Sequence, residues 1–186
     1  MEIIYRASNG KEFKKNYECE RYENNLKTTK NHDLAYYKDL AILFISESED
    51  IHLEDHSKKQ DITVFCKRAI EYLQKAIEIY DKNPDIYFLL GKAKNYSEEY
   101  QEAINFFLKA IEVNYRFPSR CYYWIAHCKG ALEEYQEAIF YYEKALEIEI
   151  QLQRDFQDNL VVACETGIEA YRSELDFEEE LKKIWK

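Results

Sequence analysis

One pair of histidines has a spacing that could support metal chemistry. His52 and His56 stand four residues apart with two acidic residues between them, which would put two zinc ligands on one face of a helix. Only these two ligands are evident, and they fall within residues 46–61, a stretch that reads as an inserted polar loop with no scaffold to fix its geometry. We therefore interpret the stretch as solvated and expect neither a metal site nor a cofactor.

A second candidate is the acidic pairs of the heptapeptide EEYQEAI, which occurs at Glu98–Ile104 and again at Glu133–Ile139. General acid–base catalysis needs a carboxyl group whose pKa is raised by burial or by a like charge. These glutamates are expected to face water in the first turn of a helix, where nothing would raise their pKa. No phosphate-binding glycine loop and no nucleophile motif is recognisable. The sequence therefore predicts that the protein is not an enzyme.

The cysteines are odd in number and widely spaced, and no Cys-x-x-Cys pair occurs. A zinc site or a disulfide framework would need closer pairing, so we expect reduced thiols in the core of a cytoplasmic protein. The first residues contain no apolar run long enough for a signal peptide, and no window resembles a membrane span. The cysteines are Cys19, Cys66, Cys121, Cys128 and Cys164.

The composition favours an all-helical globular protein. Of the 186 residues, 46% are hydrophobic and 33% are charged, which is too apolar for a disordered chain. Only 4 Gly and 2 Pro are present, too few for the turns of a many-stranded β fold. The net charge of −10 argues against a general nucleic-acid binder, which must neutralise phosphates.

The two copies of the heptapeptide lie within longer matching blocks. Each block has an aromatic, an aliphatic and a small residue before the heptapeptide, spaced to share one helix face, and an aromatic and an alanine after it. An earlier partial match covers 69–80. The matched residues are Tyr87, Leu90, Gly91, Phe107 and Ala110 in the first block, and Tyr122, Ile125, Ala126, Tyr142 and Ala145 in the second.

This pattern resembles the tetratricopeptide repeat, a helix-turn-helix unit of about 34 residues. The resemblance covers 84–150 well and 62–80 in part, and it implies an all-α α-solenoid of about three repeats with helical caps. Two departures are evident. The position that is aromatic in the family is Lys94 in one block and Lys129 in the other. The usual closing proline is absent, and Pro84 and Pro118 instead open the next units, where proline suits the first turn of a helix.

The pattern predicts three segments in the chain. Residues 1–32 would form an N-terminal cap or docking helix, centred on 10–26. Residues 33–152 would hold the repeats, at 33–80 with the inserted loop 46–61, at 84–117 and at 118–152. Residues 153–186 would form two helices, one over 153–174 and a shorter one after it, as a degenerate fourth repeat or a C-terminal cap.

The resemblance also implies where a partner would bind, because the first helices of stacked repeats line a concave groove in this family. Aromatic anchors with a few cations suit an amphipathic helix or an extended peptide that carries apolar and acidic groups. The alternative is that neighbouring repeats or a terminal helix bury some of these aromatics. The predicted partner-binding residues are Phe88, Lys92, Tyr96, Arg120, Tyr123, Trp124, His127 and Arg154.

These features predict a cytoplasmic scaffold or adaptor that binds a protein or peptide, and neither nucleic acid nor membrane. The cations Lys92 and Arg120 alone do not make the carboxylate clamp by which some family members bind chaperone tails, so that partner is disfavoured. One alternative is a self-assembling structural protein, a homo-oligomer formed through its terminal helices. Another is a small-molecule sensor or enzyme that uses the histidine insert.

Overall fold

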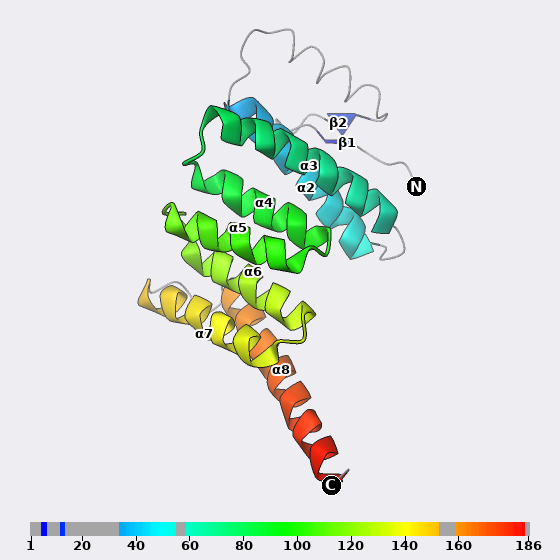
Figure 1. Ribbon diagram of the computed structural model, residues 1–186, viewed down its shortest axis with the longest axis vertical. Helices are drawn as coiled ribbons and strands as arrows, with labels where there is room; N and C mark the ends of the chain where they lie inside the picture. Colours follow the sequence, from blue (N-terminus) through cyan, green and yellow to red (C-terminus); the bar gives the residue numbers. More distant parts are fainter. Residues whose placement is uncertain (1–4, 7–11, 14–33, 55–58, 153–158, 185–186) are drawn as a thin grey trace. The chain divides into compact units, whose positions relative to one another are not determined.

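The computed structural model describes residues 5–6, 12–13, 34–54, 59–152 and 159–184 (Figure 1). This part of the chain is almost entirely helical, and it divides into two compact units, 1–97 and 98–186. The first unit holds helices α2 (Leu34–Glu54), α3 (Lys59–Ile79) and α4 (Pro84–Tyr96) and a short antiparallel strand pair, β1 (Tyr5–Arg6) with β2 (Glu12–Phe13). The second unit holds α5 (Tyr100–Glu112), α6 (Pro118–Ala131), α7 (Tyr135–Gln151) and α8 (Asn159–Ile184).

In the first unit, α2 and α3 pack along each other and α4 packs against both. Small residues allow the close approach: Ala41 of α2 and Ala69 and Ala76 of α3 are fully buried. Helix α4 begins as the sequence suggests, with Pro84 in its first turn and the Asn83 side chain accepting a hydrogen bond from the Asp85 amide at 3.0 Å. This cap satisfies one of the amide groups that every helix start leaves unpaired.

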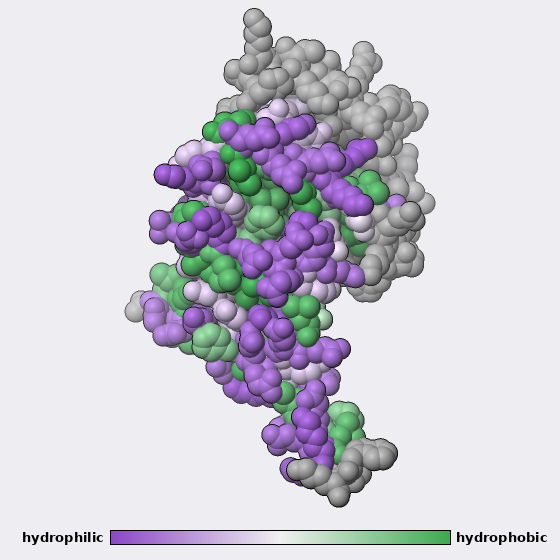
Figure 2. All heavy atoms as spheres, viewed as in Figure 1, coloured by the Kyte–Doolittle hydropathy of each residue, from purple (hydrophilic) through white to green (hydrophobic). Residues whose placement is uncertain are grey.

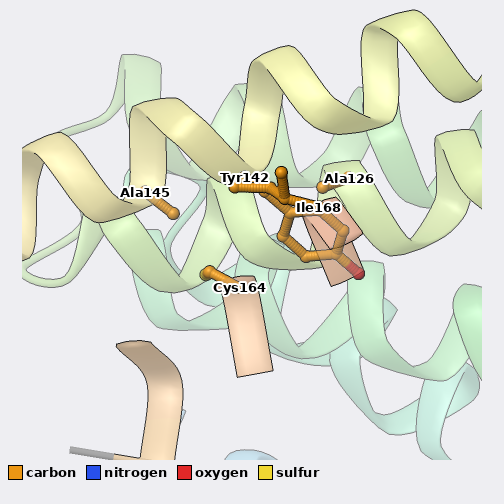
Figure 3. Close-up of a cluster of buried hydrophobic side chains, with 5 residues drawn as sticks. All are labelled: Ala126, Tyr142, Ala145, Cys164 and Ile168. Carbon is orange, nitrogen blue, oxygen red and sulfur yellow. The ribbon is translucent and has the colours of Figure 1, made fainter. Parts of the chain in front are cut away.

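In the second unit, α6 packs against α5 and α7, and α8 packs against α7 and α6. Figure 3 shows the centre of this packing, a cluster of buried side chains from three helices. Tyr142 of α7 is the largest member, and it lies among two alanines, a cysteine and an isoleucine of the cluster. The cluster consists of Ala126, Tyr142, Ala145, Cys164 and Ile168.

Both copies of the heptapeptide begin with a residue in the left-handed conformation, Glu98 with φ 60° and Glu133 with φ 62°. At the second copy this conformation ends α6: the Glu133 amide donates to the Gly130 carbonyl at 3.0 Å, and the Glu134 amide donates to the Lys129 carbonyl at 2.9 Å. The matching backbone at both sites shows that the sequence repeat is also a structural repeat.

The predicted core positions are confirmed. The alanines that follow the heptapeptide glutamates, Ala103 and Ala138, have no exposed surface, and Phe107 is also fully buried. In α8, Cys164, a thiol expected in the core, is buried, and so is Ile168 one turn later.

The inserted loop predicted over 46–61 is wrong for most of its length, because α2 continues to Glu54 and α3 begins at Lys59. Within this stretch Ser48 packs into the contact between the two helices. Its hydroxyl donates to the Phe44 carbonyl at 2.9 Å and accepts from the Cys66 thiol at 3.4 Å, so a fully buried serine is satisfied within the α2–α3 contact.

Two expectations at the ends of the chain also change. The two helices predicted over 153–186 are a single helix, α8, over the residues described there. No glycine or proline follows Gly167, so nothing in the sequence interrupts the helix. The cap helix predicted over 10–26 lies outside the described residues, except that Glu12 and Phe13 form β2. The repeat boundaries themselves remain predictions.

Candidate partner-binding site

Three predicted site residues lie on one face of α4 in the first unit. Phe88, Lys92 and Tyr96 follow each other at four-residue intervals, which places them on the same side of a helix. The Lys92 ammonium forms an ion pair with the carboxylate of Glu49 in α2, and the Tyr96 hydroxyl donates to the same carboxylate at 3.1 Å. The positive charge of Lys92 is therefore already matched within the unit.

Sequence reasoning missed Glu49, because it fell in the stretch assigned to the inserted loop. A second ion pair joins the same two helices, between Lys38 of α2 and Asp85 of α4 at 2.7 Å. Both pairs connect α2 to α4, so Lys92 and Tyr96 serve at least in part to hold the first unit together.

Four further predicted residues lie together on α6 in the second unit. Arg120, Tyr123, Trp124 and His127 occupy positions i, i+3, i+4 and i+7 of one helix face. The Trp124 ring meets the Tyr123 ring edge-on at 5.5 Å between centroids and the His127 ring edge-on at 5.7 Å. The three rings are half-buried and Arg120 is exposed. We call these four residues the α6 aromatic face.

The core of the unit supports this face from beneath. Trp124 stacks on Phe107 of α5, which is fully buried, at 6.3 Å, and Tyr123 packs against Tyr142 of α7 at 5.7 Å. Burial raises the pKa of the Tyr123 phenol, and the nearby Cys164 thiol raises it further. The phenol is therefore neutral at physiological pH. The Trp124 and Tyr123 rings are therefore held in place by packing against α5 on one side and α7 on the other.

A pair of guanidinium groups lies at the N-terminal end of the α6 aromatic face. Arg120 lies over the Phe117 ring at 5.1 Å, and Arg116 lies over the same ring at 5.2 Å. Among the residues that the structure describes, no carboxylate lies within ion-pair distance of either group. Unlike Lys92, Arg120 has no ion-pair partner among the described residues of its unit.

The lysine that departs from the family pattern has a structural role in the second unit. Lys129, at the end of α6, forms ion pairs with Glu134, which directly precedes α7, and with Glu137 of α7, the latter at 2.6 Å. Burial opposes its charge, but hydrogen bonds to the two carboxylates outweigh that effect and raise the pKa of Lys129 above its ordinary value. Two glutamates of the heptapeptide thus tie the paired helices together.

The remaining candidate residues fall outside the part of the chain that the structure describes. Arg154 and the side chains of His52 and His56 lie outside the described residues. Within the described part, no three His, Cys, Asp or Glu side chains are arranged to hold a metal ion. None of the described helices has an apolar stretch long enough to cross a membrane.

The family described as "Regulator of microtubule dynamics protein 1-3" has a model that matches residues 88–165. No curated protein matches the chain in sequence. A crystal structure of MamA is similar over 86% of this chain and 88% of its own, with a TM-score of 0.55 and 19% identity.

Two other similar structures are tetratricopeptide domains. The Sgt2 domain from Aspergillus fumigatus is similar over 75% of this chain and 82% of its own, with a TM-score of 0.53 and 18% identity. The OM64 domain from Arabidopsis is similar over 74% of this chain and 98% of its own, with a TM-score of 0.50 and 16% identity. Together with the structural repeat and the buried small residues, these similarities confirm the predicted fold class. The chain has the fold of the tetratricopeptide repeat proteins.

Proposed function

We propose that this protein is an interaction scaffold that binds a protein segment on the α6 aromatic face. The observation that carries the proposal is the combination of three half-buried rings, two of which pack on rings of the core, with an exposed Arg120 that has no ion-pair partner among the described residues. Aromatic and arginine side chains dominate the binding energy of protein interfaces, above all where packing holds them rigid. Proteins of this fold generally mediate protein–protein interactions.

The chemistry of the face defines the partner segment. Its apolar side chain would cover the rings of Tyr123 and Trp124, and its carboxylate would pair with Arg120. Arg120 and Trp124 are one helical turn apart, which is about 6 Å along the axis. A partner helix with an acidic residue one turn from an aromatic or aliphatic residue fits this spacing, as does an extended peptide with the two groups about two residues apart.

We propose a smaller contribution to partner binding for the predicted residues outside the α6 aromatic face. Phe88 and Tyr96 offer aromatic surface, but the charge of Lys92 is matched by Glu49. Lys92 is therefore proposed as a weaker determinant of partner choice than Arg120. Arg154 remains a second candidate cation by resemblance to the family.

The proposed role is non-enzymatic and cytoplasmic. Burial raises the pKa values of the Cys121, Cys128 and Cys164 thiols to about 12. Thiols with such pKa values are protonated at neutral pH and are poor nucleophiles. None of the four described cysteines forms a disulfide, which suits the reducing cytoplasm.

Selection from a displayed peptide library tests the proposal. Peptides enriched on the wild-type protein are expected to pair an acidic residue with an apolar anchor and to lose binding to Arg120→Glu. Lys144→Glu is the matched control, because Lys144 also lies over aromatic rings, 4.8 Å from the centroid of Phe140, and the charge change is the same. Enriched peptides that bind Arg120→Glu as well as they bind the wild type would refute the site.

A second candidate function comes from the family model that matches 88–165, a range that contains the whole α6 aromatic face. Because the description of that family refers to regulation of microtubule dynamics, we also propose microtubules or their associated proteins as candidate partners. Turbidity of polymerising tubulin, with and without the purified protein, tests direct action. An unchanged rate and extent of polymerisation would show that the protein does not act directly on tubulin.

A further inference from the structure

Two arginines lie over one aromatic ring at the start of α6. Arg116 belongs to the turn that joins α5 to α6, and Arg120 belongs to the first turn of α6. Their guanidinium groups lie 5.2 Å and 5.1 Å from the centroid of the Phe117 ring, within the range of a cation–π contact. The ring is half-buried, and Tyr115 meets it edge-on at 6.1 Å. The shared ring therefore brings two exposed cations together, which we call the arginine pair.

The stretch around the arginine pair contains no acidic residue, although the chain is rich in them. Acidic residues occupy 36 of the 186 positions, so a stretch of 20 residues would hold about four on average. Residues 113–132 hold none, but they include Arg116, Arg120 and Lys129. Lys129 is matched by two glutamates that follow the stretch. Neither arginine has an ion-pair partner among the described residues.

One carboxylate contacts the start of α6 from the interior of the unit. Ser119, which lies between the two arginines in the sequence, donates a hydrogen bond to Glu149 of α7, and both residues are fully buried. The arginine side chains are exposed instead. A ligand that approaches from solvent therefore meets the two guanidinium groups and not this carboxylate.

The chemistry of two neighbouring guanidinium groups matches a phosphoryl group better than a carboxylate. A carboxylate has two oxygens, and the fork of a single arginine can donate to both of them. A phosphorylated side chain carries a charge of about −1.5 to −2 and three acceptor oxygens, so it can accept hydrogen bonds from both arginines at once. Arginine clusters are a recurring means of recognising phosphorylated segments.

We propose that the partner segment carries a phosphorylated residue and that both members of the arginine pair bind its phosphoryl group. The inference rests on the proposed function and specifies the acidic group of the partner. The phosphoryl group lies at the N-terminal end of the α6 aromatic face, and the apolar anchor of the same segment lies over Trp124. Arg120 would also bind an unmodified acidic residue, whereas Arg116 supplies the additional contact. Phosphorylation of the partner thus strengthens binding.

An anionic membrane or a nucleic acid matches the arginine pair less well. Lipid surfaces are typically recognised by about four to eight clustered basic residues, and nucleic acids by several phosphate contacts. The pair supplies two cations, and the net charge of −10 repels an extended anionic surface. Figure 2 shows hydrophilic and hydrophobic side chains interspersed over the described helices on the face that it draws. A mixed surface of this kind suits a segment that has both an apolar and a charged group.

Three forms of one peptide test the proposal. The peptide is one that display selects on the wild-type protein, synthesised with glutamate, serine or phosphoserine at its acidic position. The phosphoserine form is expected to bind the wild type at least about tenfold more tightly than the glutamate form, because two arginines contact it instead of one. Equal affinities of these two forms would overturn the inference and leave the proposed function intact. A selection that yields no peptide would overturn both.

Arg116→Gln tests whether the gain comes from the arginine pair. This variant is expected to bind the phosphoserine and glutamate forms within about threefold of each other, and to change the affinity for the glutamate form by less than about twofold. Lys144→Gln is the matched control, because it removes another cation that lies over aromatic rings of the same unit, and it is expected to keep the full gain. Circular dichroism verifies that each variant is folded. An Arg116→Gln protein that keeps the full gain overturns the proposal.

Vesicles of phosphatidylcholine and phosphatidylserine distinguish a membrane from a phosphorylated protein segment. The wild type is expected to leave these vesicles unbound in a flotation assay. Vesicle binding that Arg116→Gln weakens, together with no gain from phosphoserine in the peptide, would overturn the proposal and assign the arginine pair to a lipid surface.

Discussion

The hydroxyl group of Tyr171 in α8 lies directly against the backbone of Gly130 in α6. A Cβ atom at Gly130 would lie 1.9 Å from the Tyr171 hydroxyl oxygen and 2.1 Å from the ring carbon that bears it. The same ring stacks on Tyr135 and Tyr142 of α7. Gly130 thus provides the space that lets α8 pack against both helices of the preceding pair.

Gly130→Ala is expected to destabilise the protein by up to about 2 kcal/mol. Alanine favours the helix by about 1 kcal/mol relative to glycine, but forcing a methyl group into this contact costs about 1–3 kcal/mol and displaces a large ring. Urea unfolding followed by circular dichroism measures the difference. In a Tyr171→Ala background the same substitution is expected to stabilise. An equal loss in both backgrounds would show that the contact with Tyr171 is not the cause.

Glu133→Gly is expected to stabilise the protein by about 1 kcal/mol. Glu133 has a φ of 62°, a left-handed conformation that costs a residue with a Cβ about 1–2 kcal/mol and costs glycine nothing comparable. Glu133→Ala is the control, because it removes the charge but keeps the Cβ atom. Thermal unfolding compares the three proteins. If alanine stabilises as much as glycine, the charge rather than the backbone conformation governs this site.

Ser119→Ala is expected to cost about 2–3 kcal/mol, because its hydroxyl donates a hydrogen bond to a carboxylate and both residues are fully buried. The acceptor is Glu149 in α7. In a Glu149→Gln background the same substitution should cost only about 1 kcal/mol, as expected for a hydrogen bond between neutral groups. A double-mutant cycle from urea unfolding gives the coupling. Identical losses in the two backgrounds would argue against a charged acceptor.

Stability is expected to fall as pH rises above about 9. The buried thiols of Cys121, Cys128 and Cys164 have pKa values of about 12 in the folded protein, against 9.0 ordinarily. Between these two values the folded state binds more protons than the unfolded state, so raising the pH favours unfolding. Each thiol contributes about 1.4 kcal/mol per pH unit.

Urea unfolding at a series of alkaline pH values measures this slope. Cys121→Ala is expected to make the dependence shallower, because one of the three thiols no longer titrates. A Cys121→Ala protein with the wild-type slope would show that this thiol is not protected by burial in the folded state.

Much of the fold could be predicted from the sequence, because the repeat places small and large residues at fixed intervals. Ala103 and Phe107 of the first block and Ala138 and Tyr142 of the second occupy equivalent positions of the repeat, and all four are buried. The extension of α2 could not be predicted. In that stretch Ser48 is buried and contacts Cys66 of the next helix, and local polarity carries no sign of such a contact.

The candidate site was predictable only in part. The spacing of α6 places Arg120 and Trp124 on one helix face, but their roles as binding residues remain predictions. The ion pairing of Lys92 was not predictable, because its partner Glu49 belongs to a helix that is far away in the sequence. The support of Trp124 by Phe107 likewise depends on how two helices pack. Trp124→Ala is therefore expected to lower stability as well as binding, and Arg120 is the cleaner test.

The most direct test of the proposed function is the dissociation constant of a selected peptide for three proteins, measured by isothermal titration calorimetry. Arg120→Glu is expected to bind at least about tenfold more weakly than the wild type, because it replaces an attractive charge with a repulsive one. Lys144→Glu is expected to bind within about twofold of the wild type, since this substitution changes only the long-range electrostatic attraction between protein and peptide. Equal weakening in both variants, or undiminished binding by Arg120→Glu, would contradict the assignment of the α6 aromatic face.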